Sequence, residues 1–212
     1  SYLVIDCYST IPRTLKKIKF RKIFLISDKK PIKNKSDVIV DHTFGRKIKF
    51  YDKEISKGIK CFVGVNYFPF GIKKKKNNKD FILINFGGVN DKKLIQKSLK
   101  IATKFNEYTI FILSKSFSEK DLSKEYLKNK IIIKRYVSDM RDIYKRTIFS
   151  IGSCGISLYE KIFHNIPCIC SQVIGNQKNN YINFHKKGLI IKLGDALKMD
   201  IKRIKEKLKL IE

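Results

Sequence analysis

Short apolar runs rich in β-prone residues alternate along the chain with longer stretches in which apolar residues recur at helical spacing. The first pattern is typical of buried strands and the second of amphipathic helices. The apolar runs predict strands over residues 2–6, 22–27, 37–40, 59–64, 80–86, 108–113, 131–133, 147–151, 167–171 and 189–193. The periodic stretches predict helices over residues 11–18, 91–105, 119–127, 140–145, 157–165, 177–187 and 196–210. Strands that alternate with helices indicate an α/β fold with parallel sheets and right-handed crossovers.

The alternation is uneven, and it predicts two lobes of different completeness. Residues 1–72 carry strands with few helices between them, so we expect a partial N-terminal lobe there. Residues 73–79 begin with a run of lysines and are the best candidate for a linker. Residues 80–212 alternate more regularly and predict a complete second lobe. The predicted fold class is therefore two Rossmann-like α/β lobes with parallel sheets, the N-terminal lobe being incomplete.

Residues 147–177 carry the strongest chemical signal. A short strand there runs into Gly152-Ser153-Cys154-Gly155, a small and flexible loop that lets backbone approach a ligand closely. A helix follows, and Pro167 ends it before the next strand. A Gly/Ser loop that leads into a helix N-terminus presents free backbone N–H groups and partial positive charge, which suits an anion such as a diphosphate.

Two ordinary explanations of this segment remain open. A Gly/Ser turn between a strand and a helix commonly binds nothing. Ser157 and Glu160 also form the pattern S-x-x-E, a capping box that starts helices without any ligand. The loop by itself therefore leaves a ligand site and a plain turn as alternatives.

The order of further motifs favours the ligand site. The turn Gly87-Gly88 follows a predicted strand, and the Ser/Gly loop, Glu160 and Pro167 come later, before Asn176-Gln177 at the start of a helix. Short motifs in the N-terminal part are Val4-Ile5-Asp6-Cys7-Tyr8, Ser27-Asp28, Asp37-Val38-Ile39-Val40-Asp41 and Gly64-Val65-Asn66-Tyr67. This order resembles the GT-B sugar-nucleotide enzymes. It is most similar to the UDP-sugar hydrolases of pseudaminic acid biosynthesis, the PseG family, which is related to the MurG-type glycosyltransferases. The resemblance extends to about residue 195.

The resemblance implies a GT-B-like arrangement, with UDP in the C-terminal lobe over residues 80–212 and the sugar between the lobes. It implies a UDP-sugar hydrolase of nonulosonic (pseudaminic) acid biosynthesis that acts on a UDP-linked diacetamido-trideoxyhexose without metal or cofactor. Water attacks the anomeric carbon, and the leaving UDP needs hydrogen-bond donors and positive charge. The implied substrate-binding positions are Gly87, Gly88, Gly152, Ser153, Gly155, Ser157, Glu160 and Gln177, and the implied catalytic positions are Tyr8 and Asn176.

Each implied role has a structural alternative. Glu160 would accept both ribose hydroxyls, or else cap its helix. Gly87 and Gly88 would let backbone approach the ligand, or else form only a tight turn. Asn176 would lie near the reacting centre, or else cap a helix. Tyr8 would line the active site, or else be a buried tyrosine at a strand end.

One segment of that family has no match in this chain. The hydrolases begin with Gly-x-Gly-His-x-x-Arg, whose histidine is the expected base, and none of His42, His164 and His185 stands in such a segment. A positioned general base contributes roughly 10²–10⁴-fold to the rate. We therefore expect the chain to bind UDP but to hydrolyse a UDP-sugar poorly or not at all. Two other functions stay open: a GT-B glycosyltransferase that uses a UDP-sugar donor, and a non-catalytic module that binds nucleotide or polyanions.

Composition narrows the choice of partners. A formal net charge of +28 suits a polyanion, but the lysines are spread along the whole chain. Lys, Ile, Asn, Phe and Tyr share A/T-rich codons, so a biased genome explains their abundance. No nucleic-acid-binding motif accompanies the charge, and we do not expect nucleic acid as the main partner. No apolar run reaches the roughly 20 residues of a membrane span. The oligomeric state stays open.

Cysteine usage predicts a reducing environment. The chain has five cysteines, at positions 7, 61, 154, 168 and 170, and no C-x-x-C pattern. An odd count without metal-ligand spacing predicts free thiols, no zinc site and a cytoplasmic protein. Within the predicted strand over residues 167–171, we expect Cys168 and Cys170 to face opposite sides.

Overall fold

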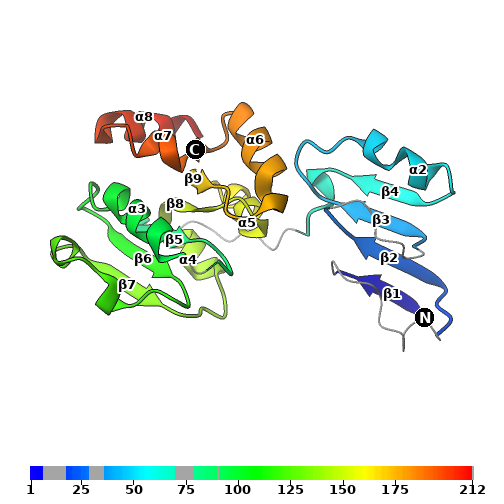
Figure 1. Ribbon diagram of the computed structural model, residues 1–212, viewed down its shortest axis with the longest axis horizontal. Coiled ribbons are helices and arrows are strands. Elements are labelled where there is room, and N and C mark those ends of the chain that lie inside the picture. Colours follow the sequence, from blue (N-terminus) through cyan, green and yellow to red (C-terminus); the bar gives the residue numbers. More distant parts are fainter. Residues whose placement is uncertain (7–17, 29–35, 70–78, 90, 212) are drawn as a thin grey trace. The chain divides into compact units, whose positions relative to one another are not determined.

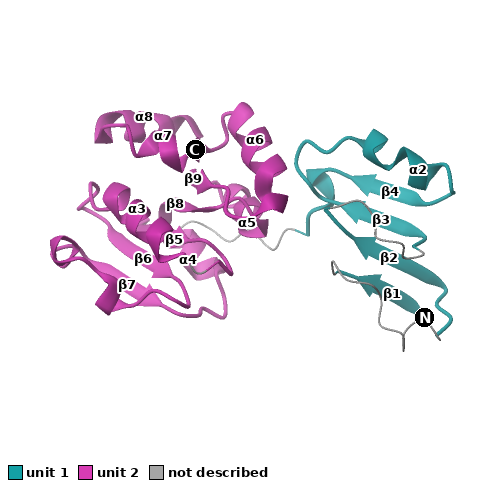
Figure 2. Ribbon diagram, viewed as in Figure 1, with its two compact units in different colours: residues 1–69 teal, residues 70–212 magenta. Residues whose placement is uncertain are grey.

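The computed structural model of the chain describes residues 1–6, 18–28, 36–69, 79–89 and 91–211. The chain divides into two compact units, Ser1–Pro69 and Phe70–Glu212, which we call unit 1 and unit 2 (Figure 2). Most of the expected linker over residues 73–79 lies outside the described residues, as does most of the predicted helix over residues 11–18. The expected lobe boundaries therefore stay a prediction, and each unit is described by itself.

Unit 1 contains one sheet of four parallel strands in the order β1-β2-β3-β4 (Figure 1). The strands are β1 (Tyr2–Ile5), β2 (Lys22–Ile26), β3 (Val38–Asp41) and β4 (Lys60–Val63). A short helix α2 (Asp52–Ile55) precedes β4. The core residues Ile5, Leu25 and Ile39 come from neighbouring strands and pack with Tyr51. These strands lie close to their predicted positions because each is a short apolar run.

The end of β3 is anchored by a buried carboxylate. Asp41 is fully buried, and its Oδ2 atom accepts hydrogen bonds from Arg46 Nε and from the Tyr51 hydroxyl, both at 2.9 Å. Its Oδ1 atom accepts from the Thr43 backbone N–H at 2.8 Å. Burial, and after it the Asp41 carboxylate, raise the pKa of the Tyr51 phenol well above its usual value. This network holds the segment after β3 and satisfies a charge that burial would otherwise penalise.

Unit 2 contains a second, larger parallel sheet in the order β10-β9-β8-β5-β6-β7. Its strands are β5 (Phe81–Asn85), β6 (Thr109–Leu113), β7 (Ile131–Lys134), β8 (Thr147–Ser153), β9 (Cys168–Ser171) and β10 (Ile191–Lys192). The chain first adds β6 and β7 on one side of β5, and then returns to place β8, β9 and β10 on the other side. The chain direction across the sheet thus reverses between β5 and β8 (Figure 1).

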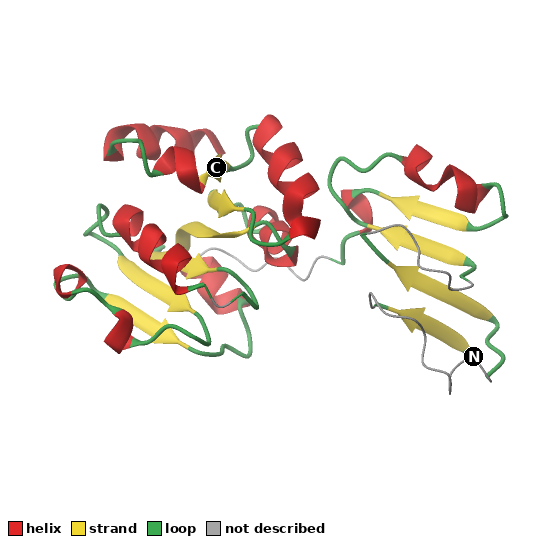
Figure 3. Cartoon of the chain, in the orientation of Figure 1, coloured by secondary structure: helices red, strands yellow, loops and turns green. Residues whose placement is uncertain are grey.

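Helices cover both faces of this sheet (Figure 3). Alternate residues of β5 separate the two faces, because side chains of a strand point to opposite sides in turn. Ile82 and Ile84 pack with residues of α3 (Lys92–Ala102) and α8 (Ile201–Ile211), whereas Phe81 and Leu83 pack toward α4 (Arg141–Arg146). Helix α5 (Ile156–Phe163) packs on β8 and β9. Helix α6 (Lys178–Lys186) contacts α5 through the rings of Phe184 and Tyr159, whose centroids are 5.4 Å apart.

Two predicted helices are wrong in form. Residues 119–127 make two 3-10 turns, Glu119–Asp121 and Lys124–Tyr126, because the Asp121 carboxylate caps the first turn at Ser118 and Leu122 is extended. Residues 196–210 split into the short helix α7 (Leu193–Ala196) and α8, which begins where the Asp200 carboxylate accepts the Arg203 N–H at 2.7 Å. In both places a local carboxylate interrupts an otherwise helical apolar period.

Candidate functional site

The carboxyl ends of β5 and β8 lie side by side, with Asn85 opposite Gly152 in the parallel register. The order of strands reverses between these two strands. In open α/β sheets, ligands bind outside the carboxyl ends of the strands at such a reversal, because the loops there diverge and leave a crevice. The Gly87-Gly88 turn follows β5 and the Ser/Gly loop follows β8, so both lie at this edge.

Four predicted positions border one small space at this edge. A Cβ atom added to Gly87 would lie 3.9 Å from Ser153 Oγ, and one added to Gly155 would also lie 3.9 Å from that oxygen. The same added atom at Gly155 would lie 3.3 Å from Gln177 Nε2. The structure thus brings together the turn after β5, the loop after β8 and the start of α6, which are far apart in the sequence. Their roles stay predictions.

The turn after β5 is held open by Asn85. Gly87 has a φ of 68°, which favours glycine, and its N–H points to Asn85 Oδ1 at 3.4 Å. The Asn85 side chain is itself fixed, because Nδ2 donates to the Leu113 carbonyl at 3.1 Å. A Cβ atom at Gly88 would meet nothing within 4 Å, so that backbone is open to a ligand.

Gly152 has a different role from its neighbours. It is the penultimate residue of β8 and is buried, and a Cβ atom there would lie 2.1 Å from the Asn85 carbonyl oxygen and 3.0 Å from Lys161 Nζ. Close packing of β8 on β5 therefore explains this glycine without a ligand. Its predicted role in substrate binding is not needed to account for it.

The start of α5 does not use the predicted capping box. The helix begins at Ile156 with Gly155 as its N-cap, and no side chain caps it. Ser157 lies within the first turn, and its hydroxyl makes no hydrogen bond with any described residue. The Ser153 hydroxyl, whose residue is only 3% exposed, is likewise without a partner among the described residues. The helix N-terminus and these hydroxyls are available for a ligand.

Glu160 is positioned by a buried tyrosine. The Tyr144 hydroxyl donates to Glu160 Oε2 at 2.8 Å, and Oε1 makes no hydrogen bond with described residues. Burial, and after it the Glu160 carboxylate, raise the pKa of the Tyr144 phenol well above its usual value, so Tyr144 stays a donor. Glu160 is half-buried and keeps one carboxylate oxygen for hydroxyl groups of a ligand.

Gln177 and Asn176 lie in a 3-10 turn before α6, but in different environments. Gln177 is 6% exposed, and its Oε1 accepts the Val173 N–H at 3.0 Å, which directs Nε2 toward Gly155. Asn176 is exposed and does not cap α6, whose N-cap is Gln177. The other predicted catalytic residue, Tyr8, lies outside the described residues.

Asn180, at the start of α6, fixes the Ser/Gly loop from the other side. Its Nδ2 donates to the Cys154 carbonyl at 3.1 Å, and its Oδ1 accepts the Tyr159 hydroxyl at 2.7 Å. The loop after β8 is therefore held between α5 and α6 in one conformation, as a preorganised binding loop requires.

Lys161 was missed by the sequence interpretation. It is 1% exposed, and its ammonium lies against Gly152, directly behind the Ser/Gly loop. It makes no hydrogen bond or ion pair with any described residue. Its nitrogen is not among the fully buried side-chain atoms that lack a partner, so solvent or a ligand can reach the ammonium although the rest of the side chain is buried. Its position in the predicted helix could have indicated burial, because Lys161 lies on the buried face of α5 with Leu158.

The thiols of Cys154, Cys168 and Cys170, near this loop, are buried. Burial raises the pKa of Cys168 well above its usual value, and contact with the Cys154 thiol does the same for Cys170. Cys168 and Cys170 contact each other, so the expectation that they face opposite sides is wrong. Residues two apart in a strand share a face. Within the described ranges, no group of three His, Cys, Asp or Glu residues is placed to hold a metal ion.

No helix in the described part of the chain is long and apolar enough to cross a membrane.

In sequence, the chain matches no known family and no curated protein. Its fold is similar to solved glycosyltransferases. MurG of Acinetobacter baumannii gives a TM-score of 0.60 at 13% identity, over 94% of this chain and 66% of that one. An Arabidopsis thaliana UGT complexed with UDP gives 0.59 at 9% identity, over 90% and 61%. A UDP-glucose:anthocyanidin 3-O-glucosyltransferase in complex with UDP gives 0.55 at 14% identity, over 83% and 48%.

These likenesses show a GT-B-like fold, as the sequence predicted, with two Rossmann-like lobes and an incomplete first lobe. The chain spans only about half to two thirds of the length of these glycosyltransferases.

Proposed function

We propose that unit 2 binds the UDP part of a UDP-sugar and that the protein transfers the sugar as a GT-B glycosyltransferase. The observation that carries this proposal is the convergence of Gly87, Ser153, Gly155 and Gln177 at the point where the strand order reverses. Nucleotides bind at such points in open α/β sheets. Two of the similar structures are complexes with UDP, which supports the choice of nucleotide.

The diphosphate is assigned to the start of α5. The first-turn N–H groups carry the positive end of the helix dipole, and the Ser153 hydroxyl lies beside them without a partner in the described part of the chain. The Lys161 side chain is 1% exposed, and its ammonium, close to Gly152, supplies a full positive charge beside the same loop. Together these groups favour a diphosphate and stabilise the negative charge that develops as UDP leaves.

Glu160 is assigned to the ribose hydroxyls. The change Glu160→Ala is expected to weaken UDP binding by about 1.5–3 kcal/mol, because it removes hydrogen bonds to a charged acceptor. Titration calorimetry with UDP measures the loss. Glu206→Ala on α8 is the matched control, since Glu206 is exposed and far along the chain from the site. An affinity equal to that of the unchanged protein would refute the ribose role.

UDP binding is expected to need no divalent metal. The positive charge at the site comes from α5 and Lys161, and no cluster of metal ligands is found in the described part of the chain. Calorimetric titrations of UDP with EDTA and with added Mg²⁺ should give the same affinity within about twofold. A loss of binding in EDTA that Mg²⁺ restores would contradict this assignment.

Hydrolysis is the second candidate, and the order of motifs from Gly87 to Gln177 favours it. Both reactions break the bond between the anomeric carbon and UDP, and they differ in the group that attacks that carbon. Release of UDP from a UDP-linked diacetamido-trideoxyhexose in water alone would support the PseG-like hydrolase. Release that depends on an added sugar or lipid-linked acceptor would support the transferase. UDP binding without release from any donor would instead support a non-catalytic module, with Asn176 and Tyr8 inactive.

A further inference from the structure

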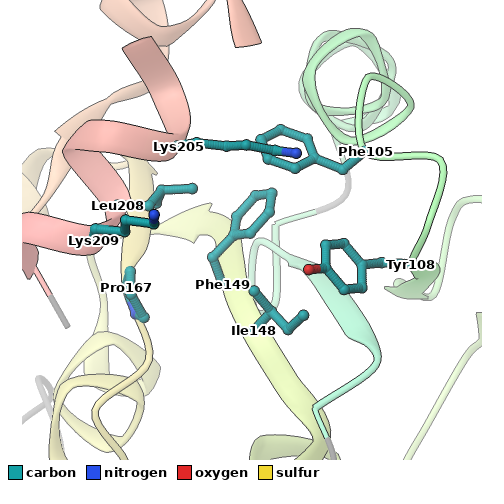
Figure 4. Close-up of a pocket in the computed structure, with 8 residues that line it drawn as sticks. All are labelled: Phe105, Tyr108, Ile148, Phe149, Pro167, Lys205, Leu208 and Lys209. Carbon is teal, nitrogen blue, oxygen red and sulfur yellow. The ribbon is translucent and has the colours of Figure 1, made fainter. Parts of the chain in front are cut away.

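Unit 2 has a pocket near the amino-terminal ends of β8 and β9, at the opposite end of these strands from the candidate nucleotide site. Its volume is about 280 Å³, it is partly open to solvent, and it is lined by the segment between α3 and β6, the start of β8 and one side of α8 (Figure 4). Ile148 lies at the start of β8 and Ser153 at its end, and a strand rises about 3.3 Å per residue, so roughly 17 Å separate the two sites. The pocket is therefore independent of the proposed UDP site.

The walls of the pocket are mainly aromatic. Phe105 and Phe149 are buried and form a tilted pair with ring centroids 4.9 Å apart. Tyr108 adds a third ring, and Leu208 of α8 closes the side opposite to Tyr108 (Figure 4). Aromatic rings favour tilted or offset contacts with a further ring, so this surface suits a flat aromatic group more than a branched aliphatic one.

The polar groups at the pocket are mostly hydrogen-bond donors. The Tyr108 hydroxyl and the Lys209 ammonium make no hydrogen bond or ion pair with described residues. The Lys205 ammonium lies 5.4 Å from the centroid of the Phe105 ring and 3.1 Å from Glu107 Oε1. That ion pair is about half exposed and therefore weak. Two lysines and one phenol thus face a single carboxylate, which leaves an excess of positive charge.

The size of the pocket limits the occupant. A volume of about 280 Å³ is near the lower end of the range of small-molecule pockets, and the pocket is partly open to solvent. This is the size of one ring with a short acid side chain. The apolar residues Ile204 and Leu208 of α8 are buried in the core, so this face of the helix packs on unit 2.

We propose that this pocket binds a small, free aromatic carboxylate. Its ring packs against Phe105 and Phe149, and its acid group faces the Lys209 ammonium. Apolar rings beside the Lys209 ammonium, which has no ion-pair partner among the described residues, favour an anion that also carries an aromatic ring. Such a site on the nucleotide-binding unit would sense a small metabolite without contacting the sugar nucleotide.

The first test uses 3-phenylpropionate as the probe and ligand-observed NMR of the full chain. We expect saturable binding with a Kd on the order of 1 mM, as suits a ligand of this size. The uncharged 3-phenylpropionamide should bind at least about fivefold more weakly, because it loses the charge-assisted contact. Equal affinity for the acid and the amide would overturn the proposal, as would no saturation at about ten times the expected Kd.

Variants locate the binding. Lys209→Gln should weaken 3-phenylpropionate by about three- to tenfold, while Lys202→Gln, on the same helix but outside the pocket, should not. Glu107→Gln should strengthen it by about two- to fivefold, because it releases Lys205. Ile148→Phe should abolish binding by filling the space, with circular dichroism confirming that the variant is folded. Unchanged affinity in Lys209→Gln and Ile148→Phe would show that the anion binds elsewhere and would overturn the proposal.

Discussion

The change Gly152→Ala is expected to lower the free energy of unfolding of unit 2 by about 3–5 kcal/mol. The added methyl group would lie 2.1 Å from the Asn85 carbonyl oxygen, a distance that no side-chain rotation can relieve. The central strands β5 and β8 would have to separate, which disturbs their register on both sides of the clash. The Lys161 ammonium, 3.0 Å from the same position, would have to move as well.

Urea denaturation followed by circular dichroism measures this loss. Gly194→Ala is the matched control, because Gly194 lies in the short helix α7 and its added Cβ atom would meet nothing within 4 Å. Alanine is favoured over glycine within helices by up to about 1 kcal/mol, so the control should be neutral or slightly stabilised. A loss in Gly152→Ala no greater than that of the control would show that β5 and β8 are packed less closely than the structure indicates.

The close packing of Gly152 against β5 could not be predicted from the sequence, although the two strands could. The strand predicted over residues 80–86 is confirmed as Phe81–Asn85, because the run Phe81–Ile84 is continuously apolar and strands of a parallel sheet are covered on both faces. The predicted strand over residues 147–151 was also correct, but it continues through Ser153. Gly152 was therefore assigned to a flexible loop. Its true role depends on the pairing of Asn85 with Gly152, a long-range register that no local pattern contains.

The candidate site was predicted in part for the same reason. Glycines, a hydroxyl and a carboxylate near a helix start are visible in the sequence, and the structure places Gly87, Ser153, Gly155 and Gln177 around one space. The capping-box pattern at Ser157 and Glu160 was equally visible, yet α5 begins one residue earlier and Glu160 bonds Tyr144 instead. Choosing between these two uses of one pattern required the position of α4, which the local sequence does not give.

The burial of Lys161 could not be predicted from the composition of the chain. The chain is so rich in lysine that one more on a predicted helix carries no signal. Only burial separates it from the exposed lysines, since Lys161 is 1% exposed. Its ammonium also lies behind the loop that we assign to the diphosphate. A charge on a nearly buried side chain, with no partner among the described residues, destabilises the free protein, and a bound anion would offset that cost.

The change Lys161→Met is therefore expected to act in opposite directions on stability and on binding. Methionine keeps the length and volume of the side chain without its charge, so unit 2 should be as stable as before or up to about 2 kcal/mol more stable. UDP should bind about 10- to 100-fold more weakly, because the diphosphate loses a nearby cation in a site of low dielectric. Calorimetry gives the affinity, and urea denaturation gives the stability.

Ionic strength separates this effect from general attraction by a basic surface. Lys97→Met is the control, because it removes the same charge from an exposed position on α3. The Debye length shortens from about 10 Å at 0.1 M salt to about 3 Å at 1 M, so any effect of Lys97 should vanish at high salt. The deficit of Lys161→Met should persist, since Lys161 is 1% exposed and salt screens such a close, largely buried pair much less. Two outcomes would remove Lys161 from the diphosphate site: unchanged UDP affinity in Lys161→Met, or a deficit that disappears at 1 M salt. The N-terminus of α5 would then be the only source of positive charge among the described residues around the loop.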